Sequence, residues 1–292
     1  MPDLTHLLQV LISGVGVGCI YGLIGIGFCV IYNASGIVNF AQGAFVMLGG
    51  VITQVLLARA GMPLVLAAIV AIAAVAAMGV VIERLVVRPL WNRNATMFVM
   101  ILATLAVQIV IERATLIAVG DQPRTLPNFT EAPPFKIAGV AISTQLLWIA
   151  GTSLALVGLL AAFFARTRTG KAMRACAINR EAAALQGIPV SRMLAYSFAL
   201  SAGLGAIAGI LITPTQYTAF NVGVPFAISG FIAAIVGGFG NALGAFVGGI
   251  MLGVAQALAI VVFGAGFKNV AALSILLVFL LVRPSGLFGK AH

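Results

Sequence analysis

Apolar runs of about twenty residues fill this chain, and short polar segments separate each run from the next. A hydrocarbon core of about 30 Å requires about 20 apolar residues for each helix that crosses it. We therefore expect an all-α, polytopic membrane protein with eight or nine transmembrane helices, some of them broken or re-entrant, in one transmembrane domain over residues 1–292. The clearest crossing segments are residues 7–32, 63–82, 95–119, 145–165, 193–213, a run that ends at Phe263, and 268–282.

The composition excludes other classes of protein. Hydrophobic residues make up 62% of the sequence and charged residues 8%, which is far outside the range of a soluble domain of this length. The net charge of +10 comes mainly from cations in a few loops. Topology and contact with anionic lipid headgroups explain such clusters, so we expect membrane lipid, and no nucleic acid, as a partner.

Residues that carry enzymatic chemistry are scarce. Histidine occurs only at His6 and His292, no pair of acids has catalytic spacing, and the glycine-rich phosphate loop that ends in Lys-Ser or Lys-Thr does not occur. Cys19, Cys29 and Cys176 have no spacing that indicates a disulfide or a metal site. We therefore expect no catalytic residue, no metal and no cofactor, and any ATP hydrolysis must come from another chain.

Residues 166–193 form a polar segment between two apolar runs, and this segment has its own folding signals. Its only acid is Glu181, and the excess of cations predicts a cytoplasmic location. Asn179 is placed to cap a short helix, Gly187 to end that helix in a left-handed conformation, and Pro189 to prevent its continuation. Ser191 is placed to cap the next helix from about residue 192. The cations are Arg166, Arg168, Lys171, Arg174, Arg180 and Arg192.

Two stretches interrupt the apolar pattern at membrane depth. Asn39 and Gln42 lie in an apolar stretch over residues 35–50, and Asn241 lies in a glycine-rich stretch over residues 237–249 that follows a short apolar run. Polar groups and broken helices are tolerated at that depth only where protein buries them or a water-filled cavity meets them. An ordinary pair of helices joined by an amide-rich turn remains the alternative for residues 35–50.

Three further segments have simpler interpretations. Gly14, Gly18 and Gly22 recur every four residues, which allows close packing of the first helix against another. Residues 83–91 are expected to form a basic loop, and the proline-rich residues 120–139 an exterior loop. Nine crossings with the N-terminus outside place the basic loops and the C-terminus inside, including Arg84, Arg88, Arg93, Arg283 and Lys290.

Several separated motifs resemble one family of transport proteins. Glu181-Ala182-Ala183 followed by Gly187 resembles the loop by which ABC importer permeases engage their ATPase. The wider set in this segment resembles the permeases of branched-chain amino acid importers: Thr169-Gly170-Lys171, Arg174-Ala175, Asn179, and Leu185-Gln186-Gly187-Ile188. Asn39-Phe40-Ala41-Gln42-Gly43 resembles the same family, except that Gln42 replaces a common histidine, which removes a titratable group. In the C-terminal third, Gln256 stands where an acid is frequent.

The resemblance implies a function, partners and a location. The chain would be the permease subunit of an ATP-driven importer and not an enzyme, forming the path for branched-chain or other small neutral amino acids. It would lie in the bacterial cytoplasmic membrane, with the N-terminus outside and the C-terminus cytoplasmic. Its partners would be cytoplasmic ATP-binding subunits, a second similar permease or a copy of itself, and an extracytoplasmic substrate-binding protein.

The resemblance also implies two sets of site residues. The ATPase-coupling set is Gly170, Arg174, Asn179, Glu181, Ala182, Ala183 and Gly187, and the translocation-path set is Asn39, Gln42, Gly43, Asn241 and Gly244. The alternative is a secondary transporter or channel for small neutral solutes such as urea or short amides. A buried ionisable group at mid-membrane would favour that alternative, whereas an ordered cytoplasmic docking helix favours the importer subunit.

Overall fold

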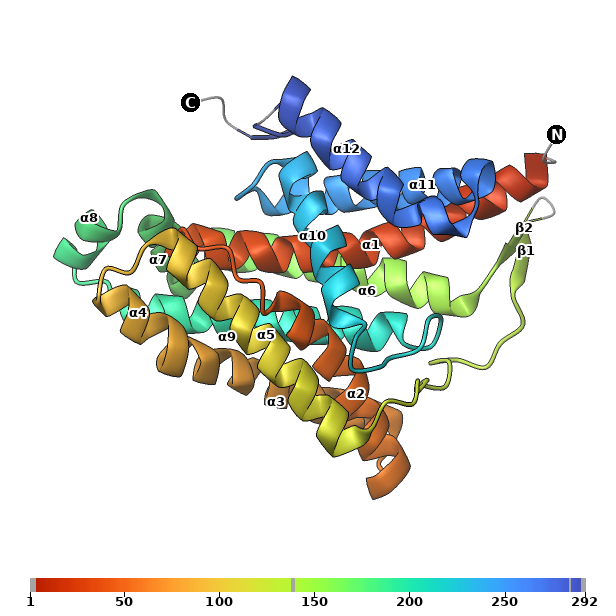
Figure 1. The fold of residues 1–292 in the computed structure, drawn as a ribbon, viewed down its shortest axis with the longest axis horizontal. Coiled ribbons are helices and arrows are strands. Elements are labelled where there is room, and N and C mark those ends of the chain that lie inside the picture. Colours follow the sequence, from red (N-terminus) through yellow and green to blue (C-terminus); the bar gives the residue numbers. More distant parts are fainter. Residues whose placement is uncertain (1–3, 138–139, 284, 290–292) are drawn as a thin grey trace. The chain divides into compact units, whose positions relative to one another are not determined.

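The protein is almost entirely helical in the computed structural model, which describes residues 4–137, 140–283 and 285–289 (Figure 1). Two short strands, β1 (Phe135–Ile137) and β2 (Val140–Ile142), pair antiparallel. The helices are α1 Leu4–Ser35, α2 Gln42–Ala60, α3 Leu64–Ile82, α4 Arg88–Asn92, α5 Met97–Val119, α6 Thr144–Arg166, α7 Arg168–Ile178, α8 Arg180–Leu185, α9 Val190–Ile212, α10 Gly223–Gly237, α11 Ala242–Phe263 and α12 Lys268–Val282.

Eight helices within these residues are long and apolar enough to cross a membrane. Helix α10 is also apolar but has only 15 residues, which is short for a full crossing. This confirms the expected all-α polytopic class and the estimate of eight or nine transmembrane helices. The eight are α1, α2, α3 with its extension to Asn92, α5, α6, α9, α11, and α12 with the turn before it.

The chain divides into two compact units. The first unit comprises Met1–Ile26, Pro127–Val157 and Ile228–His292, and the second comprises Gly27–Leu126 and Gly158–Ala227. The chain passes from one unit to the other within helices α1, α6 and α10, and between residues 126 and 127.

Helices α2, α3 and α9 form the core of the second unit. Phe45, Met47, Val75 and Phe198 are among the buried apolar side chains that pack there. Glycines bring two of the backbones together, because a Cβ atom on Gly49 would collide with the backbone of residue 206 on α9. Small residues at such contacts are how helices pack closely in membranes, where lipid offers no hydrophobic drive for helix association.

In the first unit, α1 packs against α11 through glycines, as the spacing of Gly14, Gly18 and Gly22 predicted. A Cβ atom on Gly18 would lie 2.6 Å from the Cα atom of Ile250, and one on Gly22 would lie 3.0 Å from the Cα atom of Phe246. Backbone atoms therefore meet directly along this pair of helices, and no larger residue fits at these positions without a shift.

Two local predictions were wrong, and one helix was not anticipated. The expected basic loop at residues 83–91 is helical, because α3 continues through a π-helical turn (Glu83–Val87) into α4. The predicted cap at Ser191 does not form, since α9 already begins at Val190 and its preceding residue is Pro189. Helix α7, capped by the Thr167 hydroxyl, which accepts from the Gly170 N–H at 2.9 Å, was not anticipated.

The proline-rich residues after α5 are mainly irregular, as predicted, and Arg124 fixes the first of them, residues 120–126, within the second unit. Its backbone pairs with Thr218, and its guanidinium donates to Gln54 Oε1 at 3.1 Å and to the Val119 carbonyl at 2.9 Å. The same segment therefore connects the ends of α2 and α5 with residues 213–222, the irregular link between α9 and α10.

The α1–α11 contact predicts a large difference between two glycine substitutions. Gly18→Ala should lower the apparent free energy of unfolding by about 1–3 kcal/mol, because the added methyl group overpacks against backbone. Gly158→Ala is the matched control, because that glycine faces open space on α6, and the gain in helix propensity is about 0.5–1 kcal/mol. Thermal unfolding of the detergent-solubilised variants measures both, and equal stability of the two would refute the packing argument.

Candidate functional site

The break between α1 and α2 lies inside the second unit, and side chains satisfy its backbone. Residues 36–41 are not helical, and the N–H of Phe40 donates to Thr104 Oγ1 at 3.2 Å. The N–H of Ala41 donates to Asn39 Oδ1 at 3.1 Å. Asn39 and Thr104 are completely buried, so this is loosened backbone enclosed by protein.

Gln108 of α5 holds the first turn of α2. Its Oε1 atom accepts the Ala44 N–H at 2.5 Å, and it lies one turn beyond Thr104 on the same face of α5. The side chain is buried. Sequence reasoning noticed Gln108 only as an interruption of an apolar run; the four-residue spacing between Thr104 and Gln108 was the signal that a polar face meets something inside the protein.

Gln42, the first residue of α2, is engaged with α9. Its Nε2 atom donates to the Ser201 carbonyl at 3.2 Å, and its Oε1 atom lies 2.8 Å from the Ser201 hydroxyl. That hydroxyl is also 2.8 Å from the carbonyl of Gly27, and its single proton serves one acceptor at a time. The Gln42 carboxamide therefore links α2 to α9, and the Ser201 hydroxyl connects this pair to α1.

Two buried donors beside α2 remain free. Among the residues that the structure describes, Asn39 Nδ2 and Gln108 Nε2 are buried nitrogens without a hydrogen-bond partner. Gln108 Nε2 lies against Gly223, the first residue of α10, since a Cβ atom there would be 3.1 Å from it. Gly43 and Gly223 are in backbone contact, so the first turns of α2 and α10 meet at this place.

The other two residues predicted for the path, Asn241 and Gly244, lie in the first unit. Asn241 caps α11, because its Oδ1 atom accepts the Gly244 N–H at 3.1 Å, and its Nδ2 atom is 3.4 Å from the Phe288 carbonyl. Gly244 is buried against the backbone of Gly237 at the end of α10. Asn39, Gln42 and Gly43 are thus grouped at the start of α2, while Asn241 and Gly244 form the start of α11.

The segment between α6 and α9 forms a helix pair, α7 and α8, at one end of the second unit (Figure 1). Asn179 caps α8 as predicted, with its Oδ1 atom accepting the Ala182 N–H at 3.0 Å. Gly187 has a φ of 78°, and the N–H groups of Gly187 and Ile188 bond to the carbonyls of Ala184 and Ala183. This is a Schellman ending, and it confirms the predicted left-handed stop.

The residues predicted for ATPase coupling separate into an exposed group and a supporting group. Arg174, Asn179, Glu181, Ala182 and Gly187 are exposed. Gly170 and Ala183 are buried, and Gly170 lies against the backbone of the last turns of α6, so both support the helix pair from inside.

Two apolar side chains on this helix pair were missed by sequence reasoning. Ile178 ends α7 and is 87% exposed, and Leu185 ends α8 and is 88% exposed. Each lies four residues after a charged residue, Arg174 and Glu181 respectively, so each shares a helix face with that charge. We call these four residues, Arg174, Ile178, Glu181 and Leu185, the docking surface, after the role that we propose for them below.

Arg180 anchors α8 to the body of the second unit. Its guanidinium lies 4.5 Å from the ring centre of Trp91 on α4, a cation–π contact. A Cβ atom on Gly36, just after α1, would lie 2.7 Å from its Nη2 atom. Burial lowers the pKa of Arg180, and the nearby Cys176 opposes that shift.

An ion pair between a buried carboxylate and a partly exposed guanidinium fixes the neighbouring end of α9. The Arg88 guanidinium donates to both carboxylate oxygens of Glu83, at 2.8 and 2.9 Å, and to the Ser191 carbonyl at 3.1 Å. Glu83 is fully buried in the π-helical turn, and a bidentate partner is what makes such a buried carboxylate tolerable. The Glu83–Arg88 pair thus joins the end of α3 to the beginning of α9.

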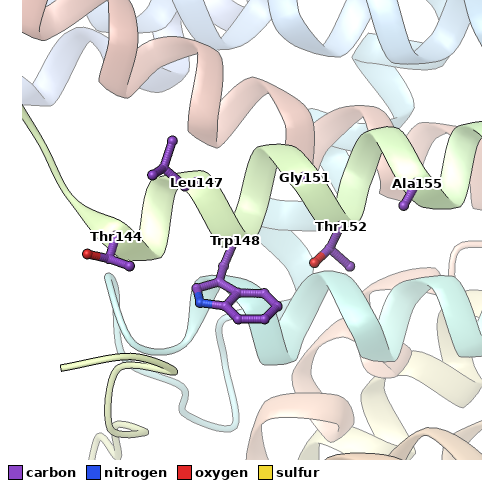
Figure 2. A pocket seen from close by; sticks show the side chains of 6 residues that line it. All are labelled: Thr144, Leu147, Trp148, Gly151, Thr152 and Ala155. Atoms are coloured by element: carbon purple, nitrogen blue, oxygen red, sulfur yellow. The ribbon is translucent and has the colours of Figure 1, made fainter. Parts of the chain in front are cut away.

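An open groove lies along α6 in the first unit, and it contains none of the predicted site residues. Figure 2 shows one helix face with Trp148 beside the small residues Gly151 and Ala155. The indole N–H of Trp148 donates to Thr130 Oγ1 at 3.0 Å. The remaining lining residues, Thr144, Leu147 and Thr152, continue the same face.

These features define a class of protein: a polytopic helical membrane permease with a helix pair exposed at one end. A solved structure of the same fold, PsaBC from Streptococcus pneumoniae in complex with Fab, aligns with a TM-score of 0.52 and 14% identity over 95% of this chain and 92% of that one. At that identity, the likeness concerns the fold alone.

The family is shown by sequence. Residues 10–282 match the family model described as the branched-chain amino acid transport system / permease component, and the chain belongs to this family. The high-affinity branched-chain amino acid transport system permease protein BraD of Pseudomonas aeruginosa is 36% identical, over 99% of this chain and 98% of its own length. The corresponding permease protein LivH of Escherichia coli K12 is 31% identical, over 98% and 96%. The chain is therefore a transport component and not an enzyme, as expected.

The contact between Arg180 and Trp91 predicts a measurable coupling. In a double-mutant cycle of Arg180→Gln and Trp91→Leu, we expect a coupling free energy of about 0.5–2 kcal/mol, because the guanidinium is partly desolvated over the ring. Arg168→Gln with Trp91→Leu is the matched control, since Arg168 is exposed at the start of α7. Unfolding of the purified variants measures both cycles, and a zero value for Arg180 would contradict the anchoring role.

Proposed function

We propose that this chain is the membrane subunit of an ATP-driven importer, and that α7 and α8 dock its ATPase. The single observation that carries the proposal is the docking surface. Two almost fully exposed apolar side chains, each beside a charge on its own helix face, end α7 and α8, and α8 has a defined cap and a defined stop. Exposed apolar residues beside charges are what a protein partner buries at the centre of an interface.

The partner at this surface would be a cytoplasmic ATP-binding subunit. Ile178 and Leu185 would enter apolar pockets of that subunit, while Arg174 and Glu181 would supply charge complementarity at the rim. The chain has no phosphate-binding loop of its own, so nucleotide must be handled by the partner.

The substrate class follows from the relatives and from the character of the site. The curated relatives are named for high-affinity transport of branched-chain amino acids. The buried groups at the start of α2 are carboxamides and hydroxyls with no ionisable side chain, which suits a small neutral amino acid and gives no means of ion coupling. We propose that Asn39, Gln42 and Gly43, with Asn241 and Gly244, belong to the translocation path.

The remaining partners follow from this function. A second permease, similar to this chain or a copy of it, would complete the path, and an extracytoplasmic binding protein would deliver the solute. Residues 1–292 would act as one permease domain.

The proposed location is the bacterial cytoplasmic membrane. The cation excess of the loop that contains α7 and α8 supports a cytoplasmic position for that loop and for the C-terminus. The N-terminus and the proline-rich residues after α5 would then be outside.

The docking proposal predicts different results for two glycines with the same backbone conformation. Gly187→Val should misdirect the end of α8, because a β-branched residue in the left-handed region costs about 1–3 kcal/mol. Leucine uptake and co-purification of the ATPase should therefore fall at least about tenfold, the factor that 1.4 kcal/mol represents. Both are measured with the complete transporter, expressed with its ATPase, partner permease and binding protein.

Gly61→Val is the matched control for Gly187→Val. Gly61 ends α2 with a φ of 62° and also faces open space, so the local strain is the same while the docking surface is unchanged. Glu181→Lys tests the charge at the docking surface without backbone strain. Normal ATPase association and uptake in both Gly187→Val and Glu181→Lys, at normal abundance, would refute the docking role of α8.

The orientation predicts opposite labelling of two exposed positions. A cysteine at Asn128→Cys should react with an impermeant thiol reagent in intact cells, whereas one at Ala184→Cys should react only after the membrane is opened. The native cysteines are buried and give a low background. Labelling of intact cells at residue 184 instead of residue 128 would reverse the topology.

A further inference from the structure

We propose that the first turns of α2 and α10, with Gln108 and Asn39 beside them, form the subsite that binds the carboxylate of the transported solute. This inference rests on the proposed function, because it names which group of the amino acid the path recognises. Gln108 was not among the residues predicted from sequence, and its place in the structure is what carries the inference.

Two buried hydrogen-bond donors near the start of α2 are unsatisfied. Asn39 Nδ2 and Gln108 Nε2 are buried and have no hydrogen-bond partner among the described residues, while the oxygen of each carboxamide is already bonded to backbone near the start of α2. A buried N–H group without an acceptor costs about 1–3 kcal/mol, so native proteins rarely retain one without a reason. Both free groups are donors, which indicates a ligand that offers acceptors.

The N-terminal ends of α2 and α10 meet at the proposed subsite. Gly43 is the second residue of α2 and Gly223 the first residue of α10, and their backbones touch. Helix N-termini carry partial positive charge, which favours anions. Gln108 contacts both helix ends. Its oxygen accepts the Ala44 N–H in α2, and its free nitrogen lies beside Gly223 in α10.

The proposed subsite lies part of the way along the second unit, away from its ends. Gly50 of α2 lies against Thr213 and Thr218, in the segment that links α9 to α10. Gly43 is seven residues earlier, which is about 10 Å deeper along a helix. Gly36, still earlier in the chain, lies beside Arg180 of α8. The paired helix starts are thus between the two ends of the second unit, where a transport subsite belongs.

The anion that fits is a carboxylate on a small solute. Carboxylate oxygens accept several N–H bonds at once, and a neutral set of amide donors holds them reversibly because no buried cation forms a permanent pair. Because Gly43 and Gly223 are in contact, their two turns must separate to admit the solute. A side chain larger than glycine at either position would keep the backbones apart and destroy this closed arrangement.

Gln108→Glu is the decisive variant. A carboxyl group at residue 108 still accepts from the Ala44 N–H, so the structural role is kept. Burial without a cation favours the protonated form of this carboxyl group, so the donor is lost and a like charge faces the solute's carboxylate only as the pH of the assay rises far enough to ionise it. Gln256→Glu is the matched control, because Gln256 is also buried with an unpartnered Nε2 atom and an oxygen that accepts, from Tyr21 at 2.9 Å, but it lies in the first unit on α11. Gln108→Leu removes both the donor and the acceptor.

The experiment measures binding of labelled leucine to the purified permease in nanodiscs, without the binding protein, at millimolar concentrations. Unlabelled leucine should compete at least about tenfold better than leucinamide, which lacks the carboxylate, because hydrogen bonds to a charged group contribute about 1.5–3 kcal/mol. Gln108→Glu should remove or reverse this preference, Gln108→Leu should remove it, and Gln256→Glu should keep it. Equal competition by leucinamide at the wild-type protein, or absence of saturable binding, would overturn the inference.

Uptake by the complete reconstituted transporter separates this inference from the proposed function. If wild-type protein accumulates leucine and Gln108→Glu does so equally well, the subsite is wrong while the importer function stands. If wild-type protein with its ATPase, partner permease and binding protein accumulates no branched-chain amino acid, the proposed function itself fails. A loss of uptake in Gln108→Glu at least about tenfold greater than in Gln256→Glu, with normal ATPase association, supports the subsite.

Discussion

A break in a helix inside an apolar protein requires hydrogen-bond partners for the freed backbone groups, and the second unit is arranged around one such break. After α1, the backbone N–H groups of Phe40 and Ala41 donate to the side chains of Thr104 and Asn39. In the first turn of α2, the Ala44 N–H donates to Gln108. Without these partners each buried N–H would cost about 1–3 kcal/mol. The position of α5 is therefore fixed by two kinds of contact: apolar packing, and the hydrogen bonds that its side chains make with the backbone at the start of α2.

Glycine contacts complete the same arrangement. Because lipid offers no hydrophobic drive for helix association, close backbone contact and polar bonds between helices must hold α2 in place. Gly49 lets α2 approach α9, and the Gln42 carboxamide bonds to Ser201 at the same interface. Helix α2 is thus held in place by a few polar bonds and by glycines, whose lack of a side chain allows close backbone contact.

The sequence predicts well what depends on neighbouring residues. The cap at Asn179 and the left-handed stop at Gly187 are local signals, and both are present in the structure. The α1 glycine spacing likewise predicts a contact, although not its partner α11. The residues at 83–91 resembled a loop because they are charged and contain Pro89, but a proline is tolerated in the first turn of α4 and Glu83 is neutralised by Arg88.

The sequence does not show partners that lie far along the chain. Gln108 bonds to a residue 64 positions earlier, so no local pattern reveals that one of its nitrogens is left free. The same applies to the docking surface: the exposure of Ile178 and Leu185 depends on how α7 and α8 lie on the rest of the unit. The family motif indicated the segment, and only the fold distinguishes its exposed residues from supporting ones such as Gly170.

Arg180 lies between the helix pair α7–α8 and the break that precedes α2. It is the first residue of α8, it lies over Trp91, and it lies against Gly36 at the start of the break that leads to Asn39. Gly36 has a φ of 64°, and a Cβ atom there would lie 2.7 Å from Nη2 of Arg180, so the guanidinium is a near neighbour of the chain at this point. If α8 moved when an ATPase bound, the displacement would pass through the Arg180 side chain to Gly36. It would then pass along six residues of chain to the first residue of α2. Coupling of this kind needs a contiguous contact with two arrangements, and the junction of Arg180, Trp91 and Gly36 is where the structure supplies the contact.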